Sequence, residues 1–213
     1  MANRQNEALN EIFRIAKKES LEDNRVAHVA ELLSVYLKFR PEHDIAWMMY
    51  GEALRVLGRK DEAYSVLTRV FDQVCDEHKS YVAAQLAMLL ELHASAAEAS
   101  HWYRKATDAL PEDDMCGWIW LYRGVNLSIL EKFDEAIVCF EKIIVAQCPE
   151  QAEALYYMGM AYRSLGDYDK AADCLRRSVG QDPAYVRAQE ALEGLEGMSY
   201  TSDLIRKING IIH

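Results

Sequence analysis

The sequence predicts an all-α fold built as an array of antiparallel helical hairpins. Three observations predict it: a set of small and large residues that recurs along the chain, a turn-forming segment inside each copy, and prolines that follow predicted helices. The chain has 213 residues, of which 51% are hydrophobic, so it can bury a sizeable core as one domain or one repeat array.

The recurring frame begins with a small residue, followed twelve positions later by alanine and four positions after that by a large side chain. Small residues let two antiparallel helices approach closely, and the large residue fills the space beside them, so each copy is predicted to be a helical hairpin. The small residues are Gly51, Ala87, Gly124 and Gly159; the alanines are Ala63, Ala99, Ala136 and Ala171; the large residues are Leu67, Tyr103, Phe140 and Leu175.

The predicted turns of these hairpins are "LGRKDEA", "HASAAEA", "LEKFDEA" and "LGDYDKA". Two of the four contain glycine where a helix C-terminus favours it. Pro111 and Pro183 then end second helices, and Pro41 precedes the first clear copy, because proline cannot continue a helix.

This pattern resembles the tetratricopeptide repeat family, whose 34-residue motif has Leu-Gly and Tyr in its first helix and Ala, Phe, Ala and Pro in its second. The segment 152–185 carries the motif most completely, whereas Ala83, Arg123 and Ser178 depart from it in their copies. The resemblance implies a right-handed superhelical array of hairpins, a tetratricopeptide solenoid. The matching residues of 152–185 are Leu155, Met158, Gly159, Tyr162, Gly166, Tyr168, Ala171, Leu175 and Pro183.

The chain is predicted to have three regions. Residues 1–43 form a degenerate N-terminal hairpin or cap with helices over 3–18 and 24–39, residues 44–185 form the repeats, and residues 186–213 form a solvating helix and an amphipathic tail helix. The four repeats are predicted at 44–77, 80–113, 117–151 and 152–185. The expected core of the N-terminal hairpin is Ile12, Ile15, Leu32, Leu33, Tyr36 and Phe39.

Charge and composition exclude several classes of protein. A net charge of −10 without a basic cluster argues against nucleic-acid binding and favours basic partners, although an acidic surface is more often just a soluble one. The N-terminus lacks the apolar segment of a secretory signal, and no window is apolar enough for a membrane span, so we expect a cytoplasmic protein without a membrane partner.

The five cysteines form no C-x-x-C pair, which predicts reduced thiols and no structural metal site. Cys75 and His78 in "CDEH" could offer a metal two ligands, but the sequence shows no second pair nearby. No cofactor is predicted, and the motifs of phosphate-binding loops, serine hydrolases and zinc proteases are absent from the sequence. We therefore expect a protein without catalytic activity.

The segment "DIAWMMYGEALRVLG" (44–58) has apolar residues on every side of its predicted helix. In tetratricopeptide proteins one side of each first helix faces the second helix, and the other side lines a concave groove. The resemblance therefore implies an aromatic, methionine-bearing groove, unless the register is off by one residue or the chain's own tail covers the surface. The expected groove residues are Met48, Met49, Tyr81, Met88, Trp118, Leu121, Tyr122, Val125, Tyr156, Tyr157 and Met160.

The tail 199–213 has aliphatic residues at helical spacing and is predicted to be an amphipathic helix. It could dock on the last hairpin, in the groove, or on a second copy of the chain to form a homodimer.

The resemblance also allows one class of ligand, the acidic tails of chaperones, to be checked against the groove residues. Tetratricopeptide domains that hold acidic chaperone tails present Lys and Asn in the groove, and this chain has neither at those positions: the residues there are Met48, Glu52, Ala84, Met88, Leu121, Val125, Tyr156 and Met160. We expect instead a chaperone-like or adaptor protein that binds an apolar peptide or helix, with groove chemistry similar to the small tetratricopeptide chaperones of bacterial secretion systems. The alternatives are an acidic immunity or inhibitor protein that masks a basic toxin site, and a self-associating scaffold subunit whose groove is filled by the tail.

Overall fold

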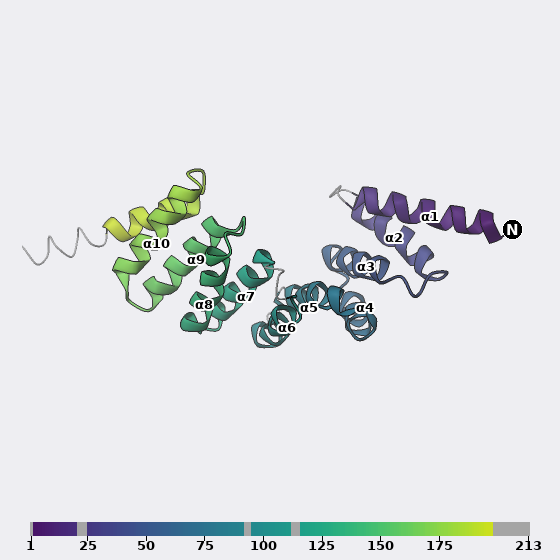
Figure 1. Ribbon diagram of the computed structural model, residues 1–213, viewed down its shortest axis with the longest axis horizontal. Coiled ribbons are helices and arrows are strands. Elements are labelled where there is room, and N and C mark those ends of the chain that lie inside the picture. The colour runs from purple at the N-terminus through teal and green to yellow at the C-terminus, as the bar shows by residue number, and fades with distance from the viewer. Residues whose placement is uncertain (1, 21–24, 92–94, 112–115, 198–213) are drawn as a thin grey trace, which may run out of the picture. The chain divides into compact units, whose positions relative to one another are not determined.

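The computed structural model describes residues 2–20, 25–91, 95–111 and 116–197, and within these ranges all the secondary structure is helical. The chain divides into two compact units, Met1–Pro111 and Glu112–His213. Within each unit consecutive helices lie side by side as hairpins (Figure 1). The predicted all-α fold of antiparallel hairpins is confirmed.

The first unit holds three hairpins, α1 with α2, α3 with α4, and α5 with α6. Their bounds are Ala2–Glu19 (α1), Val26–Leu37 (α2), Asp44–Val56 (α3), Lys60–Gln73 (α4), Asp76–Glu91 (α5) and Ala96–Asp108 (α6). The second unit holds the hairpins α7 with α8 and α9 with α10. Their bounds are Gly117–Ile129 (α7), Phe133–Val145 (α8), Gln151–Ser164 (α9) and Tyr168–Gln181 (α10).

The repeated frame marks the contact between the two helices of a hairpin. A Cβ atom added to Gly124 would lie 2.4 Å from the Phe140 ring, and one added to Gly51 would lie at the same distance from Leu67. The four frame alanines, including Ala136, are fully buried. The helices therefore approach most closely where the sequence places its small residues, as predicted.

The turns of three hairpins share one backbone conformation. Gly58, Glu131 and Gly166 each have positive φ, of 71°, 59° and 81°. After each of them a backbone N–H reaches back five residues to the preceding helix; at the first turn Arg59 donates to the Leu54 carbonyl over 2.9 Å. This is the Schellman ending of a helix, in which the left-handed residue satisfies the last free carbonyls.

The N-terminal hairpin packs through Leu33 and Tyr36, as predicted, together with Leu37. Phe39, expected in this core, is 53% exposed. The prediction extended the helix too far: α2 ends at Leu37, so Phe39 lies in the following turn and leaves the buried stripe.

Helix α3 is apolar on several sides because the chain itself packs against it from more than one direction. Met49 and Tyr50 pack against the core formed with α1 and α2, whereas Met48 packs against the core formed by α4 and α5. The run of bulky residues at 47–50 therefore packs against two neighbouring cores.

A helix over 186–197 covers the last hairpin of the second unit. Its Leu195 is buried against Ala171 and Leu175 of α10. The amphipathic tail at 199–213 lies outside the described residues.

Candidate functional site

In the first unit, polar side-chain contacts join α3 and α5, the first helices of two neighbouring hairpins. The Tyr81 hydroxyl donates to the Glu52 carboxylate over 2.7 Å, and the Arg55 guanidinium donates to the Gln85 side chain over the same distance. Burial, followed by the hydrogen bond to Glu52, raises the pKa of Tyr81 far above its ordinary value. Glu52 and Gln85, which the repeat places on this side of α3 and α5, thus take part in hydrogen bonds between the two helices.

The three predicted methionines of the first unit pack against three different buried clusters. Met48 and Met49 pack against different cores, and Met88 contacts the core around Ala87 and Tyr103. All three side chains are half-buried. Their thioethers mainly fill gaps between neighbouring helices, the usual role of methionine in a core.

In the second unit the structure brings predicted residues together around a hollow between α7 and α9. Val125 from α7 and Tyr157 and Met160 from α9 share this hollow, whose volume is about 380 Å³. The repeat also places Ile129 on this side of α7, four residues after Val125, and it lines the hollow. Phe133, at the start of α8, lines it too and was not predicted from the sequence. The complete lining is Val125, Ser128, Ile129, Glu131, Phe133, Tyr157, Met160, Ala161 and Ser164.

Aromatic pairs lie along the same two helices. The rings of Trp118 and Tyr122 on α7 meet edge to face at 6.2 Å, and those of Tyr156 and Tyr157 on α9 meet at 5.0 Å. Tyr122 is 39% exposed, whereas Tyr157 stacks on the buried ring of Phe140. Tyr122 is thus available to a partner, and Tyr157 is partly a core residue.

A third tyrosine, Tyr185, joins Tyr156 and Tyr157. Its ring lies 5.3 Å from the ring of Tyr156, just before the helix over 186–197. Its hydroxyl oxygen is buried and makes no hydrogen bond to any residue that the structure describes. Burial raises the pKa of Tyr185 to about 12, so the hydroxyl stays protonated and remains a donor at neutral pH.

Leu121 does not lie on an accessible surface. It is 6% exposed and belongs to the core of the second unit, together with Ala154 and Met158 of α9. Its place in the repeat predicted a groove position, but the side chain is buried in a cluster formed with residues of both α8 and α9.

Two family models match the chain, both described as tetratricopeptide repeats, at residues 21–72 and 152–185. The chain carries tetratricopeptide repeats in both of its units. The first match covers α2, α3 and α4, including the α2 half of the hairpin that the sequence marked as degenerate. No curated protein sequence matches the chain.

Solved structures share the fold of this tetratricopeptide repeat protein at low identity. YrrB, titled a TPR protein with an unusual peptide-binding site, is 18% identical with a TM-score of 0.67, over 85% of this chain and 90% of that one. The MamA protein is 16% identical with a TM-score of 0.68, over 85% and 96%. A chain of the APC/C hetero-tetramer Cut9–Hcn1 is 16% identical with a TM-score of 0.65, over 90% of this chain and 40% of that one.

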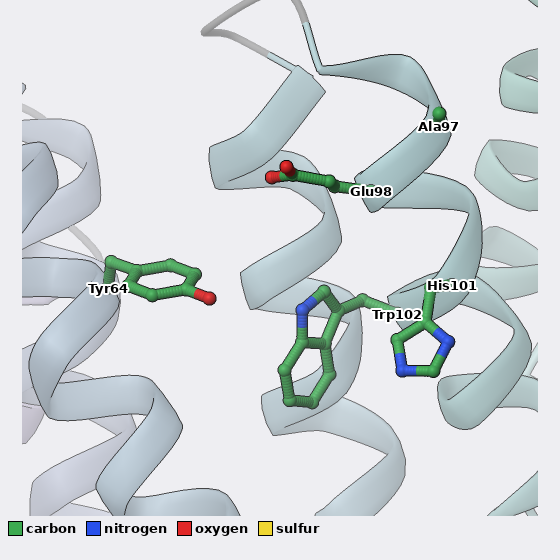
Figure 2. Close-up of a pocket in the computed structure, with 5 residues that line it drawn as sticks. All are labelled: Tyr64, Ala97, Glu98, His101 and Trp102. Atoms are coloured by element: carbon green, nitrogen blue, oxygen red, sulfur yellow. The ribbon is translucent and has the colours of Figure 1, made fainter.

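A second hollow of the tetratricopeptide repeat protein, of about 340 Å³, lies between the second helices α4 and α6, and the sequence did not predict it. Figure 2 shows the Tyr64 ring of α4 directed toward Glu98 and Trp102 of α6. The Trp102 ring meets Phe71 edge to face at 5.1 Å, and Lys105 lies 4.4 Å above it. These contacts hold Trp102 in place, so one wall of the hollow is fixed.

Among the described residues, only one group of side chains brings three potential metal ligands together. Asp44, Cys75 and His78 hold a carboxylate oxygen, a thiol sulfur and an imidazole nitrogen within 4.8 Å of one another. The sequence indicated two of these ligands but not the third. Helices long and apolar enough to cross a membrane are not found in the part of the chain that the structure describes.

Proposed function

We propose that this tetratricopeptide repeat protein is a non-catalytic, chaperone-like adaptor that binds an apolar segment of a protein partner on α7 and α9. Tetratricopeptide repeats form protein–protein interaction modules, and the question is which surface receives the partner. The hollow between α7 and α9 is the observation that carries the proposal. It combines Val125, Ile129 and Met160 in one place that is accessible from solvent.

The chemistry of this surface suits an apolar ligand. Ile129 is 60% exposed and stands beside Val125 and Met160, so a partner that covers it removes apolar area from water. The thioether of Met160 can adapt to different aliphatic shapes, and Tyr122 offers an aromatic anchor nearby on α7. YrrB, a TPR protein with an unusual peptide-binding site, is a precedent for a peptide ligand on this fold.

The proposal is tested by selecting random peptides on the purified full-length chain and measuring their affinities by fluorescence anisotropy. We expect the selected peptides to carry aliphatic or aromatic residues. Ile129→Glu places a charge in the hollow and should weaken binding by about 10-fold or more, because a charged side chain there is desolvated by the ligand. Tyr122→Ala should weaken it by a similar factor if the ring is an anchor.

Val138→Glu is the matched control. Val138 is 53% exposed on α8 of the same unit, and it is not part of the hollow. Equal loss of affinity in Val138→Glu and Ile129→Glu would contradict the assignment of the surface.

Two other outcomes would favour the alternative functions. Basic peptides whose affinity falls steeply with salt would support an acidic inhibitor. A concentration-dependent dimer that is lost when residues 199–213 are deleted would support a scaffold subunit.

A further inference from the structure

The geometry points to a binding site for a zinc-like divalent metal ion formed by Asp44, Cys75 and His78. The three residues come from two different places in the sequence. Asp44 is the first residue of α3, Cys75 lies between α4 and α5, and His78 is in the first turn of α5. All three belong to the first unit.

The ligand atoms have the spacing that a tetrahedral metal requires. The Cys75 sulfur lies 3.3 Å from His78 Nδ1, and His78 Nδ1 lies 3.9 Å from Asp44 Oδ2. With ordinary zinc bond lengths, a tetrahedral ion sets these separations at about 3.6 Å and about 3.3 Å. The observed separations therefore lie within about 0.3 Å and about 0.6 Å of these values, and the Cys75 sulfur and the Asp44 oxygen lie within 4.8 Å of each other.

The same geometry argues against a catalytic triad. In a triad the nucleophile and the carboxylate contact opposite nitrogens of the imidazole, so that one nitrogen takes the proton of the nucleophile while the carboxylate orients the ring through the other. Here the Cys75 sulfur and the Asp44 oxygen both approach Nδ1 of His78. Three electron-pair donors that face one point fit a shared cation.

The ligand types select the class of metal. A thiolate and an imidazole favour zinc and similar transition metals over magnesium or calcium, which prefer oxygen ligands. Thiolate and carboxylate together carry two negative charges and balance a divalent ion. Three protein ligands leave a fourth tetrahedral position for water.

The surroundings hold the ligands in place while leaving them accessible. The backbone N–H of Cys75 donates to Asp44 Oδ2 over 3.3 Å, which fixes the carboxylate beside the thiol. Cys75 is exposed, and His78 and Asp44 are about one-third exposed, so an ion can reach the site from solvent. A bound metal would tie the start of α3 to the connection between α4 and α5.

The test uses the full-length, tag-free, metal-free protein under reducing conditions and titrates it with Co²⁺, followed by competition with Zn²⁺. We expect one cobalt per chain, with a thiolate-to-cobalt absorption band that disappears in Cys75→Ser. His78→Gln and Asp44→Asn should weaken zinc binding by more than about 10-fold, since even residues behind the ligands commonly contribute that much. Circular dichroism of each variant checks that the helices are retained.

The matched controls are Cys116→Ser and His101→Gln, which replace the same residue types outside the cluster. A second readout is alkylation of the native protein: zinc should slow the modification of Cys75. Cys139 and Cys174 should react slowly with or without zinc, because burial raises the pKa of both thiols to about 11. A thiolate band that survives in Cys75→Ser, or zinc affinity equal in His78→Gln and His101→Gln, would overturn the proposal.

Discussion

At the scale of single residues, glycines of the repeat frame lie where the facing helix of the hairpin leaves no room for a larger side chain. Gly124 has the Phe140 ring so close that a Cβ atom would lie 2.4 Å from one ring carbon and 2.8 Å from another. Phe140 is fully buried and stacks on Tyr157, so the ring has little room to move.

We predict that Gly124→Ala lowers the free energy of unfolding by about 1–3 kcal/mol, the usual cost of overpacking a core. Gly124→Leu should be at least as destabilising. Chemical denaturation of the full-length chain measures the change.

Gly180→Ala provides the control for this prediction. Gly180 also lies in a helix, α10, but an added Cβ would meet no atom of the described residues within 4 Å. Alanine should therefore stabilise the helix there by up to about 1 kcal/mol through its higher helix propensity. Equal stability of both variants would show that the close approach at Gly124 is not tight.

At the scale of elements, the same helix ending is built from different residues. Gly58 and Gly166 occupy the left-handed position in two turns, and Glu131 occupies it in a third with φ of 59°. Glycine adopts this conformation without steric cost, whereas a residue with a Cβ atom is strained by about 1 kcal/mol or more. The hydrogen bonds are nevertheless the same, since Lys132 donates to the Leu127 carbonyl over 2.9 Å.

We predict opposite effects from exchanging the residue at two equivalent turns. Glu131→Gly should raise the free energy of unfolding by up to about 1 kcal/mol, and Gly58→Ala should lower it by about 1 kcal/mol. Thermal unfolding of both variants tests the prediction. Stabilisation by Gly58→Ala would mean that this turn does not use the left-handed conformation.

At the scale of the whole molecule, each unit has a core of its own. The second unit buries Phe140, Ile143 and Met158 in one cluster and Ala171, Leu175 and Leu195 in another. A segment of about 100 residues can bury enough apolar surface to fold alone, although with a small margin of stability.

We therefore predict that residues 112–213 fold as an isolated fragment, with a helical circular dichroism spectrum and a cooperative thermal transition. The shorter fragment 112–198 tests the tail. A lower melting temperature in the shorter fragment is expected if the amphipathic segment 199–213 docks on the last hairpin, because its aliphatic residues would otherwise face water. A longer fragment without cooperative unfolding would contradict the independence of the unit.

The sequence by itself determined the hairpins and their contacts. Close approach of two helices needs small residues at fixed spacing, and this local requirement is visible along the chain: Gly51 meets Leu67 and Gly124 meets Phe140 as the frame predicts. Part of the candidate surface could also be predicted from the sequence, since the predicted residues Val125 and Met160 line the same hollow.

The tertiary structure alone decided which of these surfaces remain accessible and which distant side chains meet. Leu121 is buried in a cluster with residues of α8 and α9, and the Glu52 carboxylate on α3 accepts a hydrogen bond from Tyr81, 29 residues later on α5. Asp44 joins Cys75, 31 residues away, because the connection before α5 returns to the start of α3. Helical periodicity specifies the direction of a side chain on its own helix, but the partner it meets depends on how the next hairpin packs.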